Sequence, residues 1–516
     1  MSKSLHSALP DLARMARTVL AFVVLCGLPL AAEDSAHSLG LSEEVVPLEE
    51  FGQSAQSRQK TITEAIDDAV FPENKEREAL LAARAPDDVT TELPERKSLF
   101  GQDRFLSPGP IDPGTTSPTG ATWRPSFFSF GTYRTALQSF EAPDGQRTNE
   151  WANRLDLFGN FSLTSTERLL IGFRPLDDEG TFTGVGRRQG ESTKFRNGWD
   201  GEPHTFFIEG YLDELFPRFD PDERMGLDLG YSLGRQPLFL QNGILANDNL
   251  DAIGLTKHNF FRMNASATRL SAYVAFNEVH RNDRRRDSGA TLFALSSTLD
   301  YPKQTLEIDA AYVNGTNPGD GGSGNGAYFG IGRIARIGYW NSTLRVNGSF
   351  AMHSGQNAGG ISAVNDGWLF THQLSRTMKH SDDIFTISTY SEQGDYTSAA
   401  RDPATGGALG NFTLLQRAVG LGSYGAPLDT EAGDALGFEL SYQHFLDSEE
   451  RRQLLISTGA ARTETPSGDY TVTGAMGLQY QEALSKNLIL RAGGFGTVTD
   501  DGEKGFGIRT ELLRKF

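Results

Sequence analysis

The last twelve residues of the chain, 505–516, read GFGIRTELLRKF and decide the fold class. Phe506, Ile508 and Leu512 fall on one set of alternate positions, whereas Arg509 and Glu511 fall on the other. Because successive side chains of a β-strand point to opposite faces, this two-residue period predicts a strand with one apolar face and one polar face. Strands of this kind build membrane barrels, whose outer surface meets lipid while the inner surface meets water.

The final strand closes on Phe516. An aromatic residue at that place looks like the terminal signal by which the barrel assembly machinery recognises bacterial outer-membrane proteins. Tyr442 and Tyr480 lie in two further alternating segments, 435–446 and 472–481, and fit the aromatic girdles of such barrels. We therefore expect Phe516 to be a barrel-assembly signal and the assembly machinery to be a partner.

From residue 126 onward, alternating segments are separated by turn residues. Short connections such as 164–166 and 301–303 alternate with long Gly- and Asp-rich loops such as 176–202 and 391–434, and this segregation is typical of outer-membrane barrels. The sequence predicts an all-β fold, a transmembrane antiparallel β-barrel over 126–516, with 18 strands, or 16 because two of them alternate poorly (250–260 and 364–375). The expected strands are 128–140, 151–163, 167–175, 203–213, 224–235, 250–260, 268–280, 289–299, 304–314, 326–338, 342–353, 364–375, 383–391, 434–446, 452–463, 471–482, 487–498 and 505–516.

Two segments precede this region. Residues 1–32 have a basic start, an apolar run and small residues at Ala31 and Ala32, a pattern typical of a secretory signal peptide. Residues 33–125 are rich in charge, Ala, Pro and Ser, and predict a polar, largely disordered periplasmic leader with one amphipathic helix over 57–70. A plug or partner-binding arm is the alternative for this leader.

Composition excludes several function classes. The net charge of −18 argues against nucleic acid as a partner, because phosphate binding needs a basic surface. The single cysteine excludes a disulfide framework and a Cys-based zinc site. A G-x-G-x-x-A match at 330–335 lies within a strand pattern, so it predicts no dinucleotide site. We expect no cofactor and no metal ion.

The polar faces of the strands carry arginines that we expect to line a water-filled lumen. Carboxylates such as Asp156, Glu307 and Glu511 share these faces, so the charges either pair across strands or leave an arginine track for an anionic solute. The first three strands bring several of the arginines close together. The pore-lining candidates are Arg134, Arg154, Arg168, Arg174, Arg235, Arg345, Arg491 and Arg509.

One stretch resembles a family. Residues 233–236 read LGRQ and end a strand, and Leu250, Asp251 and Ala252 follow after a loop. This pattern is similar to the alginate export family of outer-membrane porins. The resemblance implies an 18-stranded barrel that lets an anionic polysaccharide out through an arginine-rich lumen. Strict alternation would point Arg235 outward, so its place in the lumen requires a bulge near Gly234 or a position at the rim.

Together these patterns predict an exported, porin-like channel in the outer membrane of a Gram-negative cell. We expect it to pass small or polymeric anionic solutes down a gradient, with loops 176–202 and 391–434 as the constriction. Outer-membrane lipid and lipopolysaccharide are expected partners, the latter through the basic loop 281–287. The alternatives are a non-transport surface barrel acting as adhesin or receptor, and an enzyme with a site near His353; we expect no catalytic residues.

Overall fold

The computed structural model describes residues 113–141, 145–178, 180–219, 228–261, 263–282, 286–315, 324–353, 362–379, 381–431, 433–464 and 468–516. The predicted signal peptide, the predicted helix over 57–70 and the leader up to residue 112 lie outside these residues. The described end of the predicted leader contains a short hairpin. Thr115–Thr116 (β1) and Thr122–Trp123 (β2) pair as a small antiparallel sheet, with Gly120 donating a turn hydrogen bond to Ser117.

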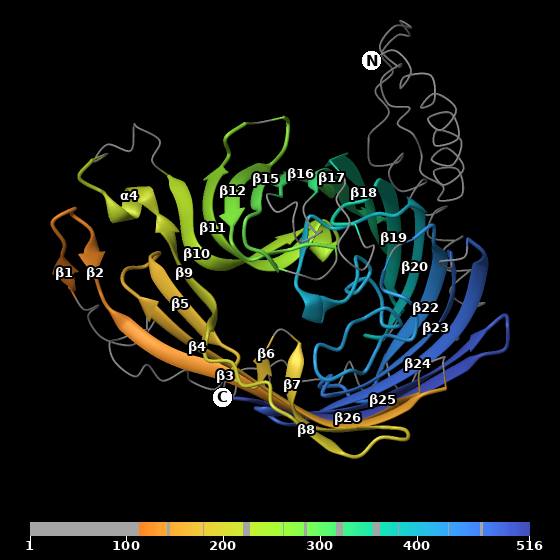
Figure 1. Ribbon diagram of the computed structural model, residues 1–516. Helices are drawn as coiled ribbons and strands as arrows, with labels where there is room; N and C mark the ends of the chain where they lie inside the picture. Colours follow the sequence, from red (N-terminus) through yellow and green to blue (C-terminus); the bar gives the residue numbers. More distant parts are fainter. Residues whose placement is uncertain are drawn as a thin grey trace, which may run out of the picture. The chain divides into compact units, whose positions relative to one another are not determined.

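Within the described residues, eighteen antiparallel strands form a closed barrel (Figure 1). The predicted count of 18 is confirmed, and the two poorly alternating segments are strands. The barrel strands are β3 (Ser126–Glu141), β4 (Arg147–Ser162), β5 (Arg168–Phe173), β9 (Pro203–Tyr211), β10 (Leu229–Leu240), β11 (Ala246–His258), β12 (Ala267–Phe276), β15 (Thr291–Tyr301), β16 (Gln304–Asn314), β17 (Asn325–Ile337), β18 (Trp340–His353), β19 (Gly367–Thr377), β20 (Ile384–Gly394), β22 (Leu436–Phe445), β23 (Arg452–Glu464), β24 (Tyr470–Ser485), β25 (Leu488–Thr499) and β26 (Lys504–Lys515).

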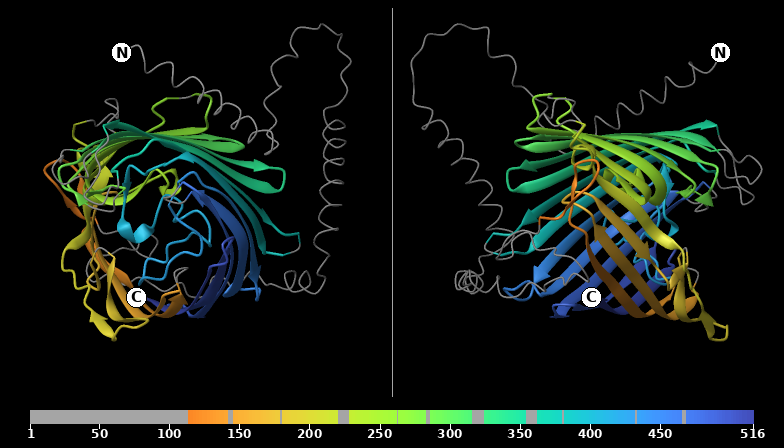
Figure 2. Two further views of the ribbon diagram at one scale, coloured as in Figure 1. Left: turned by 45° about the vertical axis from the view of Figure 1, so that its right-hand side comes forward. Right: turned by 90° about the vertical axis from the view of Figure 1, so that its left-hand side faces the viewer.

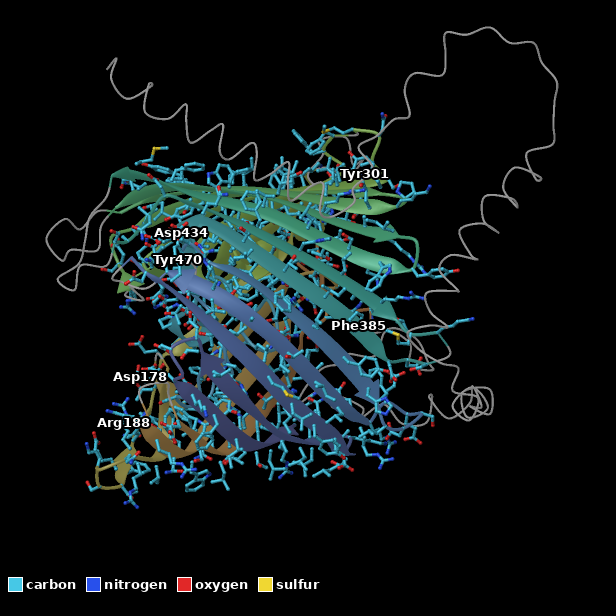
Figure 3. The ribbon with its side chains drawn as sticks, turned by 90° about the vertical axis from the view of Figure 1, so that its right-hand side faces the viewer. Asp178, Arg188, Tyr301, Phe385, Asp434 and Tyr470 are labelled. Atoms are coloured by element: carbon cyan, nitrogen blue, oxygen red, sulfur yellow. The ribbon has the colours of Figure 1, made fainter. Side chains whose placement is uncertain are left out.

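The last strand closes the wall against the first. β26 pairs with β3 from Phe506 opposite Glu141 to Lys515 opposite Thr132. β3 therefore starts and β26 ends at the same end of the barrel, where short turns join the strands; we call this the turn end. The opposite, loop end carries the segment between β20 and β22. Figure 3 places Tyr301 and Phe385 toward the turn end and Asp434 and Tyr470 toward the loop end.

The two faces of the wall differ as the alternation predicts. On β26, Ile508 is 62% exposed on the outer face, whereas Arg509 and Glu511 are buried toward the lumen. Neighbouring strands continue the apolar outer face, for example with Leu137 and Phe293. Since a wide exposed apolar belt is unfavourable in water, this surface fits a lipid environment.

The described part of the chain also forms several shorter elements. None of the helices in the described part of the chain is long and apolar enough to span a membrane. The additional elements are β6 (Asp177–Asp178), β7 (Thr181–Arg188), β8 (Lys194–Arg196), α4 (Leu212–Leu215), η2 (Gln241–Gly243), β13 (Val279–His280), β14 (Arg286–Asp287), β21 (Ala400–Arg401) and η4 (Pro403–Thr405).

The apolar core lies inside the barrel. The tip of the β10–β11 hairpin brings Leu240, Leu245 and Leu250 against Leu292 and Val313 on the inner wall. A second core forms where the segment 395–435, between β20 and β22, enters the lumen, as Figure 2 shows in the view along the barrel. The lumen is therefore partly filled by the chain's own segments.

Candidate functional site

Two segments meet across the lumen at the loop end. The short strand β21 runs parallel to β11, with Ala246 opposite Ala400. Tyr396 and Ser398 both donate side-chain hydrogen bonds to the carbonyl of Ile244, at 3.2 and 2.6 Å. The hairpin tip and the segment 395–435 thus form one structure that narrows the lumen.

The hairpin tip is fixed to the barrel wall by Gln241. Its Nε2 donates to Asp309 Oδ2 of β16 at 2.6 Å. The wall has room for this side chain because Gly330 of β17 lacks a side chain: a Cβ there would lie 2.5 Å from Gln241 Cγ. Three consecutive residues, Gln241 to Gly243, have positive φ, a conformation that ordinary side chains rarely adopt, so the tip is a specific turn. The glycines of the 330–335 match serve packing.

The segment 395–435 is anchored to the other side of the wall by arginines. Arg134 and Arg154 donate to the carbonyls of Val419 and Gly420 at 3.1 and 2.9 Å, and Arg509 donates to the carbonyl of Leu421 at 3.3 Å. These three arginines come from β3, β4 and β26, which are neighbours in the wall. Wall side chains therefore hold loop backbone by charge-assisted hydrogen bonds.

An apolar contact supplements these bonds. Leu415 is fully buried, and its two methyl carbons lie against Gly459 of β23 and Gly477 of β24. A Cβ at Gly477 would lie 3.0 Å from Leu415 Cδ2, so the glycines form the socket for this side chain. The Leu415 amide donates to Glu439 at 3.1 Å.

The lumen arginines gather around two carboxylates. Glu511 accepts from Arg134 at 2.6 Å and from Arg509 at 2.8 Å, and Arg491 lies 4.0 Å away. Asp156 is shared in the same way by Arg154 and Arg174, each at 3.1 Å. Each carboxylate therefore meets more than one guanidinium, and positive charge remains in excess on this side of the lumen.

A cavity of about 380 Å³ lies between the segment 395–435 and the strands β22–β26 and β3. Arg134, Arg417, Arg491, Arg509 and one carboxylate, Glu511, are its charged lining residues. Four glutamines from β22, β23 and β24 add amide groups, and apolar side chains such as Leu414, Val419 and Phe495 complete the lining. The glutamines are Gln443, Gln453, Gln479 and Gln481.

Arg417 differs from the wall arginines. It is exposed within this cavity and forms no ion pair with any residue that the structure describes. The other side of the cavity holds Tyr424, which packs edge-on against Phe495 and lies under the guanidinium of Arg509 at 5.8 Å. Burial raises the pKa of Tyr424 to about 12, partly offset by Arg509, so the ring stays neutral at ordinary pH. The cavity therefore offers one unpaired cation beside an uncharged aromatic surface.

Three of the eight predicted pore-lining arginines line this cavity, namely Arg134, Arg491 and Arg509; Arg154 of β4 lies outside its lining and holds the Gly420 carbonyl. Arg174 follows β5 directly and shares Asp156 with Arg154. Arg345 faces the lumen from β18, outside this cavity, and donates to Glu307 at 2.8 Å. Arg168 pairs with Glu209 near the turn end and remains half exposed.

Arg235 departs from the prediction. It shares the face of β10 with Leu233 and Phe239, which are 51% and 53% exposed, and not with the buried Gln236. The ladder to β9 is continuous through Gly234, so no bulge resets the alternation. Arg235 instead pairs at the rim with Asp251 and Glu278, at 2.9 and 2.8 Å.

The two predicted constriction loops behave differently. The loop expected at 391–434 enters the lumen. The loop expected at 176–202 mainly extends the wall, because β7 pairs with β4 and β8 pairs with β7; Phe182 packs in a cluster with Leu421 of the segment 395–435, and Arg196 donates to Ser423 Oγ at 3.2 Å. Alternation could not identify Arg417 or the Gln241 turn, because both lie in irregular segments. The side chain of His353 lies outside the described residues, so the predicted catalytic alternative is not tested.

No family model matches the chain, and no curated protein matches it. Membership of the alginate export family is therefore not shown. The chain resembles the solved structure of Pseudomonas aeruginosa OccK7 (OpdD) with 10% identity and a TM-score of 0.49, covering 76% of this chain and 98% of that one. The figures for Acinetobacter baumannii OccAB2 are 13% identity, a TM-score of 0.46, and 76% and 98% coverage. A BenF-like porin from Pseudomonas fluorescens Pf-5 is 10% identical, with a TM-score of 0.49, and the match covers 76% of this chain and 98% of that one. Likenesses at this level carry no inference about function.

Proposed function

We propose that the chain is a passive outer-membrane channel for small anionic solutes. The observation that carries this proposal is the cavity beside the segment 395–435, where four arginines face one carboxylate and Arg417 forms no ion pair with any described residue. Rings or tracks of arginine favour anions in pores. The closed barrel and its apolar outer belt support a membrane location, with the lumen as the route across.

The filling of the lumen restricts the size of the solute. The hairpin tip and the segment 395–435 are bonded to each other and to opposite walls. A polymer such as alginate would have to displace these bonds, whereas a small solute needs only the space beside Arg417. We therefore confine the proposal to small solutes, and leave out the polysaccharide that residues 233–236 suggested.

Uptake into liposomes tests the proposal. The refolded chain should accelerate swelling of vesicles in an anionic solute more than in a neutral or cationic solute of similar size. An Arg417→Gln variant should lose much of this preference, whereas Arg168→Gln, which changes an arginine outside the cavity, should retain it. Equal rates for the three solutes, or a preference for the cation, would refute the proposed selectivity.

A further inference from the structure

A groove of about 710 Å³ crosses the outer face of the barrel over β26, β3, β4 and β7. Its large apolar lining residues are Leu137, Trp151 and Ile508, which project outward and are 65%, 48% and 62% exposed. Between them lie the smaller side chains of Ser139 and Thr510. The groove therefore has large apolar side chains on its sides and lies on the face of the barrel that is expected to contact lipid.

The strand register explains the groove. One row of outward residues runs across seven neighbouring strands, from β24 to the β7–β8 hairpin. This hairpin extends the wall beyond the short strand β5, so the row continues past β4 and ends on Phe195, which is 70% exposed. The row consists of Tyr480, Ala492, Thr510, Leu137, Trp151, Val185 and Phe195.

Arginines border the groove toward the loop end. Arg187 is opposite Asn149 of β4, and Arg147 lies two residues further along that strand on the same face. Residues two positions apart across a strand pair are within reach of one another's long side chains. Arg188 is the next residue of the hairpin, so its side chain alternates to the opposite face of β7, the face of the buried Phe182, and it does not border the groove; Figure 3 shows it toward the far end of that hairpin.

Arg147 and Arg187 form no ion pair with any residue that the structure describes. Arg147 instead stacks on the ring of Phe506 at 5.1 Å. Two acidic residues lie nearby: Glu191, which already accepts from Lys194 at 2.9 Å, and Glu141, opposite Arg147 in the ladder. The border therefore keeps an excess of positive charge next to an apolar groove.

We propose that this groove and its border of Arg147 and Arg187 bind one phosphorylated glycolipid of the outer leaflet. An acyl chain lies in the groove, and a phosphate of the headgroup accepts hydrogen bonds from the guanidiniums, which match phosphate oxygens in bidentate geometry. Basic residues at a membrane surface favour anionic lipid over zwitterionic lipid. This inference rests on the proposed outer-membrane location, with the loop end outside the cell.

The test uses the full refolded chain in detergent, with bisphosphorylated lipid A and phosphatidylethanolamine as probes, and native mass spectrometry as the readout. We expect one lipid A per barrel in preference to phosphatidylethanolamine. The variant R147Q/R187Q should bind lipid A at least about tenfold more weakly, since each basic group contributes near a surface. The variant K303Q/R336Q, which changes two basic residues near the turn end, is the matched control and should bind normally.

A second variant tests the acyl chain separately. Thr510→Trp fills the groove between Leu137 and Ile508 without changing the charge, and should weaken lipid A binding while the barrel remains folded. Equal affinity for the two lipids, no effect of the arginine changes, or a dimer of this chain in place of bound lipid would overturn the proposal. Because all these residues lie outside the lumen, conductance should stay unchanged, so failure here is distinguishable from failure of the channel function.

Discussion

Leu415 is the position at which the segment 395–435 depends most on one side chain. Replacing it with alanine leaves the amide bond to Glu439 in place and removes only the methyl groups seated on Gly459 and Gly477. A fully buried leucine contributes about 2–5 kcal/mol relative to alanine when the vacated space does not collapse. A value of about 3 kcal/mol would raise the undocked fraction of this segment roughly a hundredfold.

Undocking opens the lumen, so single-channel recording is the appropriate assay. The Leu415→Ala barrel should visit a state of larger conductance roughly a hundred times more often than the wild type. Leu299→Ala is the matched control, because Leu299 is also buried, at 3% exposed, but lies on β15 near the turn end, outside the apolar clusters in the lumen. Its loss should lower the free energy of unfolding without adding the larger conductance state.

The outcome that would refute this reasoning is specific. If Leu415→Ala lowers the stability of the barrel as much as Leu299→Ala does, yet shows the conductance pattern of the wild type, then Leu415 does not hold the segment across the pathway. The narrowing would then depend on the arginine bonds to the carbonyls of residues 419–421.

Three further predictions concern the same pathway. Arg417→Gln should lower anion preference by about fivefold, because one charge near a solute is worth about 1 kcal/mol. Thermal stability should not change, because the guanidinium has no ion pair among the described residues to lose. The reversal potential measures the anion preference, and melting curves measure the stability. Gly330→Val should displace Gln241 and raise conductance, because even a Cβ would lie 2.6 Å from Asn347 Oδ1; unchanged conductance would show that the tip is not docked there. Burial raises the pKa of Tyr424 from 10.0 to about 12, so the contribution of this side chain to docking of the segment 395–435 is complete below pH 10 and is lost as the pH rises toward 12. Ultraviolet titration follows the ionisation of the ring. Tyr424→Phe should remove this alkaline loss of the narrow state.

The strands were predictable because alternation is a local property. Each outward residue of β26, such as Ile508, is followed by an inward one, and this holds wherever one face meets lipid and the other meets the lumen. The boundaries were less predictable. The strand expected at 224–235 starts and ends earlier than β10 does, and proline, which removes a ladder donor, lies within its extension at Pro237. In the structure, β9 stops pairing at Arg235, so Pro237 lies where its nitrogen needs no partner and β10 continues to Leu240.

The site was only half predictable. The wall arginines follow alternation, but their carbonyl partners at residues 419–421 depend on how a long irregular loop folds, which no local period encodes. Arg417 carries no sequence signal, because its role follows from the absence of a neighbouring carboxylate after folding. The rim position of Arg235 shows the reverse: alternation pointed it outward, and only the resemblance at residues 233–236 suggested the lumen.

The most direct test of the central claim is the reversal potential of the refolded chain in a planar bilayer under a salt gradient. An arginine-lined pathway predicts steady conductance with anion preference, which weakens as the salt concentration rises and screens the charges. Absence of conductance, or a preference for cations, would contradict the account.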